Sequence, residues 1–377
     1  MGDVGKDVRT LRMVRLAAVW GDTPPLPAAA LILDAWMDDL FPLLKPQTFE
    51  EPALGDPVHL AVLRDESLAL LAARPGVAMR MIDGTFGGGG HTRGLLAATA
   101  PNGLVLALDA DPNAIRRAEG LRAEYGDRLI VRQANFAQMG TEAALLGWTA
   151  GSVDGILLDL GLSSFQLADP ARGFSFALDG PLDMRFDPDA ALDAATVVNT
   201  WDETALADLF WAYGEEPAAR RVAREIVRRR ERRPFVRTVE LANMVASAKG
   251  MRRGRIHPAT QVFQALRIAV NDELGVLERA LIAARDLLRP GGRMAVISFH
   301  SLEDRAVKQF FRHEASDTEP DTLPRNVPVA PASREPTMRV LTKKPVVAGA
   351  AELGRNPRAR SAGLRVAEKL PVGSGQA

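Results

Sequence analysis

Short apolar runs alternate with helical patterns along most of the chain. Runs that predict β-strands lie at residues 77–82, 104–108, 129–131, 153–158 and 294–299, with two further candidates at 338–342 and 364–367. Helical patterns follow the first two runs, at residues 92–100 and again after Asp111 and Pro112, where a proline in the first helical turn loses no hydrogen bond. Short apolar strands alternating with helices predict a parallel α/β sheet.

The alternation stops between residues 190 and 250, where the pattern is helical throughout. Thr200 and Glu203 have capping-box spacing, and an apolar helix face follows, made of Leu206, Leu209, Phe210 and Tyr213. The α/β pattern resumes with a helical run at 263–288 and a Pro-Gly-Gly turn at 290–292. We therefore predict a doubly wound sheet, residues 56–167 and 266–377, interrupted by an inserted helical domain at 168–265. Residues 1–55 form an N-terminal extension to which the sequence assigns no function.

The composition narrows the chemistry that the protein can perform. Lys+Arg and Asp+Glu number 47 each, so an affinity for nucleic acid has to come from local patches of charge. The chain has no cysteine, which excludes disulfides, thiolate zinc sites and iron–sulfur clusters and fits a cytoplasmic location. No apolar run is long enough to span a membrane. The 5 histidines lack the spacing of metal ligands, and we predict no essential metal.

A glycine-rich loop, DGTFGGGGH at residues 83–91, connects the first predicted strand to the first helix. Ligands of open α/β sheets bind at the carboxyl ends of the strands, where glycine lets the backbone approach them closely. The dinucleotide fingerprint G-x-G-x-x-G is absent, which argues against a nicotinamide or flavin enzyme. Asp109 ends the second strand, at the place where an acid accepts hydrogen bonds from ribose hydroxyls. Asp83 and Asp109 together are typical of class I S-adenosylmethionine methyltransferases, which have a Rossmann-like fold.

The absence of cysteine also limits the methyl acceptor. Methylation of carbon 5 of a pyrimidine needs a nucleophile, usually a thiolate, and radical methylation needs a cysteine-ligated cluster. The acceptor should therefore carry its own lone pair, as an amine or a hydroxyl does, and the enzyme contributes positioning and desolvation.

Six blocks of sequence resemble the ribosomal RNA small subunit methyltransferase H family. They are residues 83–91, LLDLGLSS at 157–164, RGFSF with GPLDMR at 172–185, HPAT with FQALRI at 257–268, SFHSLEDR at 298–305, and NPRARS at 356–361. They follow one another in order between about residues 56 and 369. The resemblance implies a cytoplasmic bacterial enzyme that uses S-adenosylmethionine to methylate N4 of a cytidine in the decoding region of 16S rRNA, within the small ribosomal subunit.

The resemblance also implies site residues. The cofactor contacts of the family fall on Gly89, Gly90, His91, Asp109, Phe136, Asp159 and Gln166, and Asp159 is the candidate catalytic residue. The sequence departs from the family pattern at Phe165, usually proline, at Ala168, usually aspartate, and at Gln261, usually arginine. His59 begins a further block that also deviates.

Candidate RNA contacts come from a basic segment and from the block at 298–305. Residues 220–233 contain eight arginines against Glu225 and Glu231, which predicts a helix with a basic outer face. The candidates there are Arg228, Arg229 and Arg232, followed by Lys249, Arg252, Arg253 and Arg255; a solvated helix surface is the alternative. His300 and Ser301 are candidates for contact with the target nucleotide, although an isolated histidine is more often structural. Glu303 and Arg305 are expected in structural ion pairs.

Two other functions remain open at this stage. The chain could methylate another amine, in a DNA base or a protein side chain. It could also be a non-catalytic RNA-binding factor of ribosome assembly, for which Phe165 and Ala168 are the hints.

Overall fold

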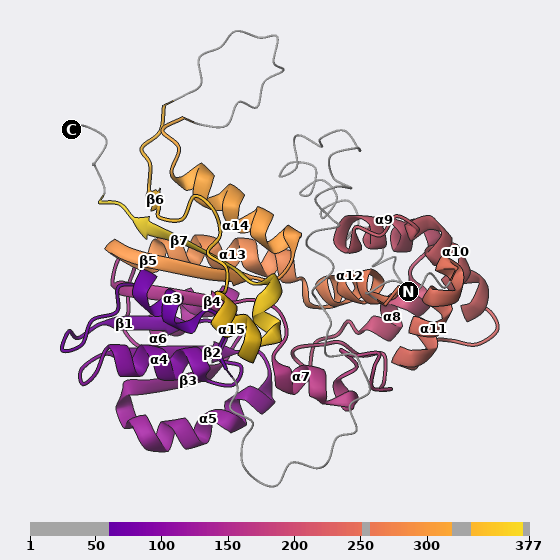
Figure 1. Ribbon diagram of the computed structural model, residues 1–377, viewed down its shortest axis with the longest axis horizontal. Coiled ribbons are helices and arrows are strands. Elements are labelled where there is room, and N and C mark those ends of the chain that lie inside the picture. The colour runs from indigo at the N-terminus through magenta and orange to yellow at the C-terminus, as the bar shows by residue number, and fades with distance from the viewer. Residues whose placement is uncertain (1–59, 251–256, 319–332, 372–377) are drawn as a thin grey trace. The chain divides into compact units, whose positions relative to one another are not determined.

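The computed structural model of the protein describes residues 60–250, 257–318 and 333–371 (Figure 1). The predicted extension at 1–55, His59, and the candidate RNA-binding residues Arg252, Arg253 and Arg255 lie outside these ranges. None of the helices within them is both long enough and apolar enough to cross a membrane.

A seven-stranded sheet forms the centre of the described chain, with the strand order β3-β2-β1-β4-β5-β7-β6. Its strands are β1 (Arg80–Asp83), β2 (Leu104–Asp109), β3 (Leu129–Gln133), β4 (Val153–Asp159), β5 (Leu288–Ser298), β6 (Met338–Val340) and β7 (Gly363–Lys369). The first five are parallel, as predicted, but β7 runs antiparallel to both of its neighbours. The strand order changes direction at β1, and such a switch point opens a crevice beyond the carboxyl ends of the strands.

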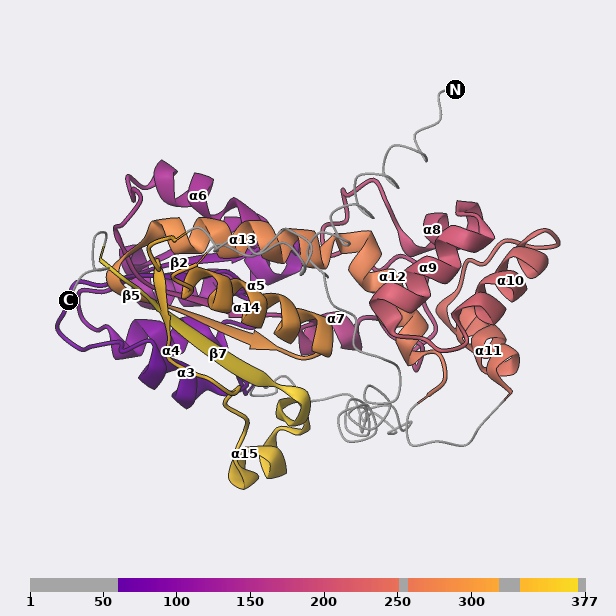
Figure 2. The same ribbon diagram turned by 90° about the horizontal axis from the view of Figure 1, so that it is seen from above.

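Helices cover both faces of the sheet. Successive residues of a strand point to opposite faces, and because apolar residues lie on both faces, each face is covered by helices. Met81 and Leu157 pack in one core, between the sheet and the helices α3 (Arg64–Leu70), α4 (Gly90–Ala98) and α5 (Pro112–Tyr125). The short helix η2 (Gly126–Arg128) follows α5. Ile82 and Leu158 pack in the other core, against α6 (Met139–Leu145), α13 (Glu273–Leu287) and α14 (Ser301–Glu314). Figure 2 shows α3 and α4 on one side of the strands and α6 and α13 on the other. The doubly wound sheet is therefore confirmed.

The predicted turn at 290–292 is wrong, because these residues belong to β5. Val153 pairs with Leu288 and Gly155 with Arg293, so residues 289–292 leave the ladder opposite the single residue Asp154. Arg289 lies in this unpaired segment and donates to the Asp154 carboxylate at 2.6 Å. A Pro-Gly-Gly sequence suits such a bulge as well as it suits a turn between a helix and a strand.

A separate hydrophobic core unites the helices inserted between β4 and α13. After α7 (Ser164–Ala168) and η4 (Pro170–Arg172) come α8 (Ala194–Thr200), α9 (Glu203–Gly214), α10 (Ala219–Arg230), α11 (Thr238–Lys249) and α12 (Thr260–Asn271). Leu206, Leu209 and Phe210 are buried in this core and Tyr213 packs at its edge, as predicted. The predicted cap of α9 is wrong, because Asp202, not Thr200, accepts from the third backbone N–H.

The helical run predicted at 263–288 is two helices. The chain breaks at Asp272, whose φ of 50° is in the left-handed region. Residues of α12 on both sides of the expected boundary at 265, such as Val262 and Ala269, pack in the inserted core, whereas α13 packs on the sheet. After β6, the elements α15 (Ala350–Arg355) and η5 (Pro357–Ser361) precede β7.

Candidate active site

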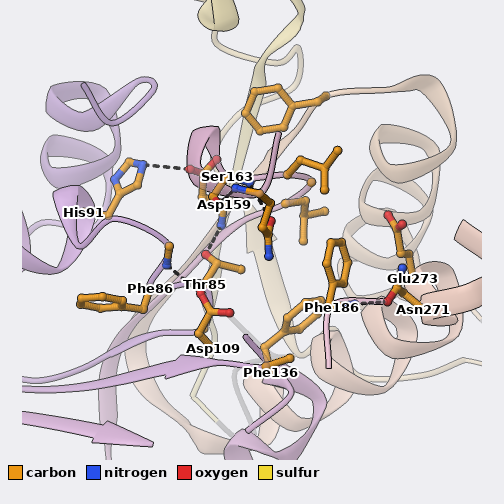
Figure 3. Close-up of a pocket in the computed structure, with 18 of the residues that line it drawn as sticks. Thr85, Phe86, His91, Asp109, Phe136, Asp159, Ser163, Phe186, Asn271 and Glu273 are labelled. Carbon is orange, nitrogen blue, oxygen red and sulfur yellow. Dashed lines mark hydrogen bonds and ion pairs between the residues drawn. The ribbon is translucent and has the colours of Figure 1, made fainter. Parts of the chain in front are cut away.

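A pocket opens at the carboxyl ends of β1, β2 and β4 (Figure 3). The glycine-rich loop and the segments that follow β2, β3 and β4 form one side of it, and segments from the inserted helices and the C-terminal region form the other. Its lining includes Thr85, His91, Asp109, Phe136, Asp159, Ser163, Gln166, Phe186, Asn271, Glu273, Phe299 and Arg358.

The glycine-rich loop needs glycine for both conformation and space. Gly89, with φ of 77°, precedes the first residue of α4, and a Cβ atom there would lie 2.9 Å from the Phe86 ring. A Cβ at Gly84 would lie 2.4 Å from Leu158. At its glycines the loop therefore brings backbone to the wall of the pocket.

Asp83 holds the start of the glycine-rich loop through hydrogen bonds. Its carboxylate is fully buried and accepts from the Thr92 hydroxyl at 2.6 Å and from the Thr85 N–H at 3.1 Å. Burial raises the pKa of Asp83 above its ordinary value. These bonds tie the start of the loop to α4, so the role of Asp83 is structural.

Asp109 ends β2 and faces the pocket. One carboxylate oxygen accepts from the Gly87 N–H at 2.8 Å and the other from the Asp111 N–H at 2.9 Å. Burial raises the pKa of Asp109 to about 6, although both hydrogen bonds lower it. A carboxylate has about four acceptor positions, so Asp109 can still accept hydrogen bonds from a ribose.

Asp159 ends β4 beside His91. Its N–H donates to the Thr85 hydroxyl at 2.7 Å, and its Oδ2 lies 3.6 Å from His91 Nε2 (Figure 3). Burial raises the pKa of Asp159 to about 7, an effect that Arg358 opposes and that Asp83 and Glu303 increase. Its other oxygen, Oδ1, is buried and has no hydrogen-bond partner among the described residues. A buried acceptor of this kind is suited to a ligand that donates a hydrogen bond.

Gln166 and Phe136 are placed by local capping. Gln166 forms a capping box with Ser163 at the start of α7 and donates to the Asp111 carboxylate at 3.2 Å. Phe136 begins η3 (Phe136–Gln138), which Asn135 caps. Six of the seven predicted cofactor contacts line the pocket, and Gly89 lies just outside the lining, as the residue before α4.

Other lining residues were not predicted as site residues. Phe186 comes from the inserted segment, and its backbone is held from two directions. Its N–H donates to Asn271 Oδ1 at 2.7 Å, and its carbonyl accepts from Arg172 at 2.8 Å. Asn271, Glu273 and Arg358 lie in or beside sequence blocks that were recognised, but only the folded chain brings them to this pocket.

The predicted RNA contacts lie elsewhere. Arg228 and Arg229 are exposed on α10, and both bind Glu225, with shortest distances of 2.6 Å, which lowers the pKa of that glutamate to about 2. Together with Arg232, Arg233, Phe235 and Glu240 they line an open surface groove. This basic groove is a surface to which RNA could bind, but contact with RNA stays a prediction.

His300 and Ser301 occupy the start of α14, outside the lining of the Asp159 pocket as far as the chain is described. The His300 ring is largely buried and its Nδ1 caps α14, while its Nε2 lies 3.1 Å from Glu303. Ser301 donates to Glu215 at 3.1 Å, and Arg305 binds the same carboxylate. As expected, Glu303 and Arg305 each take part in an ion pair, Glu303 with His300 and Arg305 with Glu215. The contact of His300 and Ser301 with a nucleotide stays a prediction.

One group in the described chain has the geometry of metal ligands, namely Glu273, His300 and Glu303. Arg267, however, already binds both oxygens of Glu273, at 2.7 and 2.8 Å. The guanidinium supplies the positive charge that a cation would bring, and the absence of an essential metal stays our prediction.

The strand order, the antiparallel β7, the glycine-rich loop after β1 and the acids that end β2 and β4 define a class I S-adenosylmethionine-dependent methyltransferase. The sequence matches the MraW methylase family over residues 56–370, and the chain belongs to this family. S-adenosylmethionine is its cofactor.

Individual proteins are similar over nearly their whole length. The ribosomal RNA small subunit methyltransferase H of Thermomicrobium roseum is 55% identical over 321 residues, which cover 84% of this chain and 96% of that protein. The protein of the same name from Syntrophobacter fumaroxidans is 49% identical, over 83% of this chain and 97% of its own. The crystal structure of an rRNA methylase from Streptococcus thermophilus covers 85% of this chain and 100% of its own, but at 10% identity and a TM-score of 0.34 it adds nothing to the assignment.

Proposed function

We propose that this protein transfers the methyl group of S-adenosylmethionine to N4 of a cytidine in the 16S rRNA of the small ribosomal subunit. The single observation that carries the chemistry is the buried Asp159 Oδ1, which lacks a hydrogen-bond partner among the described residues and lines the pocket beside the glycine-rich loop. The substrate is supported by three relatives at 49%, 50% and 55% identity that are named for the ribosomal RNA of the small subunit.

The residues of the pocket fit the cofactor. Asp109 would accept from the ribose hydroxyls, Phe136 would lie against the adenine, and the backbone of residues 89–91 would approach the methionine part, with Gln166 beside them. The backbone that the loop glycines expose to the pocket and the acceptor positions of Asp109 support this placement. When bound, the cofactor supplies an electrophilic methyl group on a positively charged sulfur.

Asp159 is the residue that we assign to the acceptor. The N4 amine of cytosine is a weak nucleophile because its lone pair is delocalised into the ring. A hydrogen bond from this amine to Asp159 Oδ1 would draw the nitrogen toward tetrahedral geometry and aim its lone pair at the methyl group. As the N–C bond forms, N4 becomes cationic and loses a proton to the same carboxylate. A base with a pKa of about 7 is well matched to such a transfer at neutral pH.

The inserted helices are the part of the chain that we assign to RNA recognition. The basic groove of Arg228, Arg229 and Arg232 would bind phosphates, while Ser301 and His300 mark the surface where α14 meets the insertion through Glu215. A cytoplasmic location is part of the proposal, because a ribosomal substrate would be met there.

Methyl-labelled S-adenosylmethionine tests the proposal directly. We would offer it with undermethylated small subunits, free rRNA, DNA and protein, and identify the product by mass spectrometry of digested RNA. The expected product is N4-methylcytidine in the small-subunit RNA. Label in DNA or protein would favour a different amine substrate. Binding of small subunits without label in any acceptor would favour a non-catalytic assembly factor, and a methyl group on a ribose oxygen or a ring carbon would exclude the mechanism.

A further inference from the structure

Arg358 enters the pocket from the C-terminal part of the chain. It lies in η5, which is anchored on both sides of it: Asn356 donates to the Leu60 carbonyl at 3.0 Å, and the Ala359 side chain is buried. From this fixed turn the guanidinium reaches the segment after β4 and donates to the Leu162 carbonyl and to the Ser164 hydroxyl. The contact joins parts of the chain that are 194 and 196 residues apart.

The segment that Arg358 holds is residues 159–164, here called the 159–164 loop. Its first residues are fixed by the sheet, since the Asp159 N–H donates to Thr85 and the Leu160 N–H donates to the Ile297 carbonyl at 3.0 Å. Gly161 then turns the chain with φ of 90°. Arg358 binds the loop at Leu162 and Ser164, and the Ser163 N–H donates to Gln166 in the capping box of α7. The sheet therefore holds the start of the loop, and Arg358 and Gln166 hold its end.

The same guanidinium is also a counter-charge for Asp159. Four ionisable groups face that carboxylate: Asp83 from β1, His91 from α4, Glu303 from α14 and Arg358 from η5. The two acids oppose ionisation of Asp159, and Arg358 favours it. Burial lowers the pKa of Arg358, but an arginine stays protonated at neutral pH. Arg358 therefore supplies a positive charge in the wall of the pocket, where it favours the ionised form of Asp159.

We propose that Arg358 is a positioning residue for methyl transfer, which holds the 159–164 loop and favours the anionic form of Asp159 that accepts the hydrogen bond of the acceptor amine. The inference rests on the role of Asp159 in the proposed function. Two separable properties of the side chain are involved. Its forked donors bind the loop at two points, which lysine cannot reproduce, whereas its charge is a property that lysine shares.

The test is the pH dependence of single-turnover transfer at saturating cofactor, counted as methyl label incorporated. For the native protein we expect the rate to rise with pH through a midpoint near 7, because Asp159 has to be ionised. In Arg358→Met the midpoint moves to higher pH: the first unit of movement lowers the rate at pH 7 about fivefold, and each further unit about tenfold. The rate recovers in alkali only in part, because methionine also lacks the two contacts that hold the loop. In Arg358→Lys the midpoint stays near that of the native protein, while the rate falls at every pH because the loop is held less firmly.

Two controls make the outcome decisive. Arg355→Met removes an exposed arginine that donates only within α15 and should change nothing. Ser164→Ala removes one acceptor of Arg358 but not its charge, and should lower the rate without moving the midpoint. A folded Arg358→Met protein with an unmoved midpoint would overturn the inference, as would a folded one with the native rate. If Arg358→Met does not fold, an Arg358→Lys protein with a displaced midpoint would overturn it. A product other than N4-methylcytidine would instead refute the proposed function and leave the midpoint comparison valid.

Discussion

Arg172 and Asp111 form a buried ion pair with a nitrogen–oxygen distance of 2.8 Å, which ties the start of the helical insertion to the helix after β2. The same guanidinium donates to the carbonyls of Arg185 and Phe186, and the Asp111 carboxylate also accepts from Gln166. One pair of charges thus fixes Phe186 and Gln166, which line the pocket of Asp159 from different segments.

Loss of this pair should destabilise the fold. Arg172→Met leaves the Asp111 carboxylate buried without its counter-charge, and we expect a loss of about 3–5 kcal/mol in the free energy of unfolding, measured with urea. Arg289→Met is the matched control, because Arg289 binds Asp154 from a half-exposed position and should cost less than about 1 kcal/mol. Equal losses in the two variants would contradict the importance of the Arg172 pair.

Asp109→Ala should weaken S-adenosylmethionine binding while the fold stays intact. The substitution removes the acceptors expected for the ribose hydroxyls, and hydrogen bonds to a charged group contribute about 1.5–3 kcal/mol, which is a loss in affinity of about tenfold or more. Calorimetric titration measures the change. Asp127→Ala, at an exposed position in η2, is the control. Native affinity in a folded Asp109→Ala protein would refute the assignment.

Asp159→Ala should abolish transfer by more than its loss of cofactor affinity explains. General-base catalysis contributes about 10²–10⁴-fold, and we expect a loss in this range at saturating cofactor. Rapid-quench measurement of label transfer separates the chemical step from binding. Recovery of the native rate at saturating cofactor would show that Asp159 only binds the cofactor.

Asp159→Asn should show how much the buried Asp159 carboxylate lowers the free energy of unfolding. Burial raises the folded-state pKa of Asp159 to about 7, so the folded protein holds a proton that the unfolded chain releases near pH 4. This stabilising effect is complete below about pH 4 and is lost as the pH rises through about 7. The asparagine variant should therefore be more stable than the native protein at pH 8, by about 1–3 kcal/mol, and by less at pH 5. Urea denaturation at both pH values that gave the same difference would contradict this.

The basic groove predicts a salt effect on RNA binding. Charge reversal at Arg228, Arg229 and Arg232 should weaken association and flatten its dependence on salt, without changing cofactor affinity. Glu225→Gln is a sharper test, because it frees Arg228 and Arg229 from their partner and should tighten RNA binding. Reversal at the exposed Lys308 and Arg312 of α14 serves as control. An unchanged slope of log affinity against log salt would mean that α10 is only a solvated surface.

The sequence predicted the elements whose patterns are local. These are the buried strands, the glycine-rich loop and the acids that end β2 and β4. Each could be predicted because a few consecutive residues determine it. Competition between equivalent signals explains the errors: Asp202 and Thr200 are both good caps for α9, and Pro-Gly-Gly fits a bulge as well as a turn. Phe186, Asn271 and Arg358 were missed as site residues because their places in the pocket depend on contacts between distant segments.

The position of Arg358 in the chain also has a consequence for biosynthesis. Every other described residue that lines the pocket precedes it, and β7, which follows it, has to insert between β5 and β6 to complete the sheet. A ribosome therefore has to translate Arg358 and β7 before the pocket closes. A partly translated chain, still attached to the ribosome that is making it, therefore lacks the complete pocket.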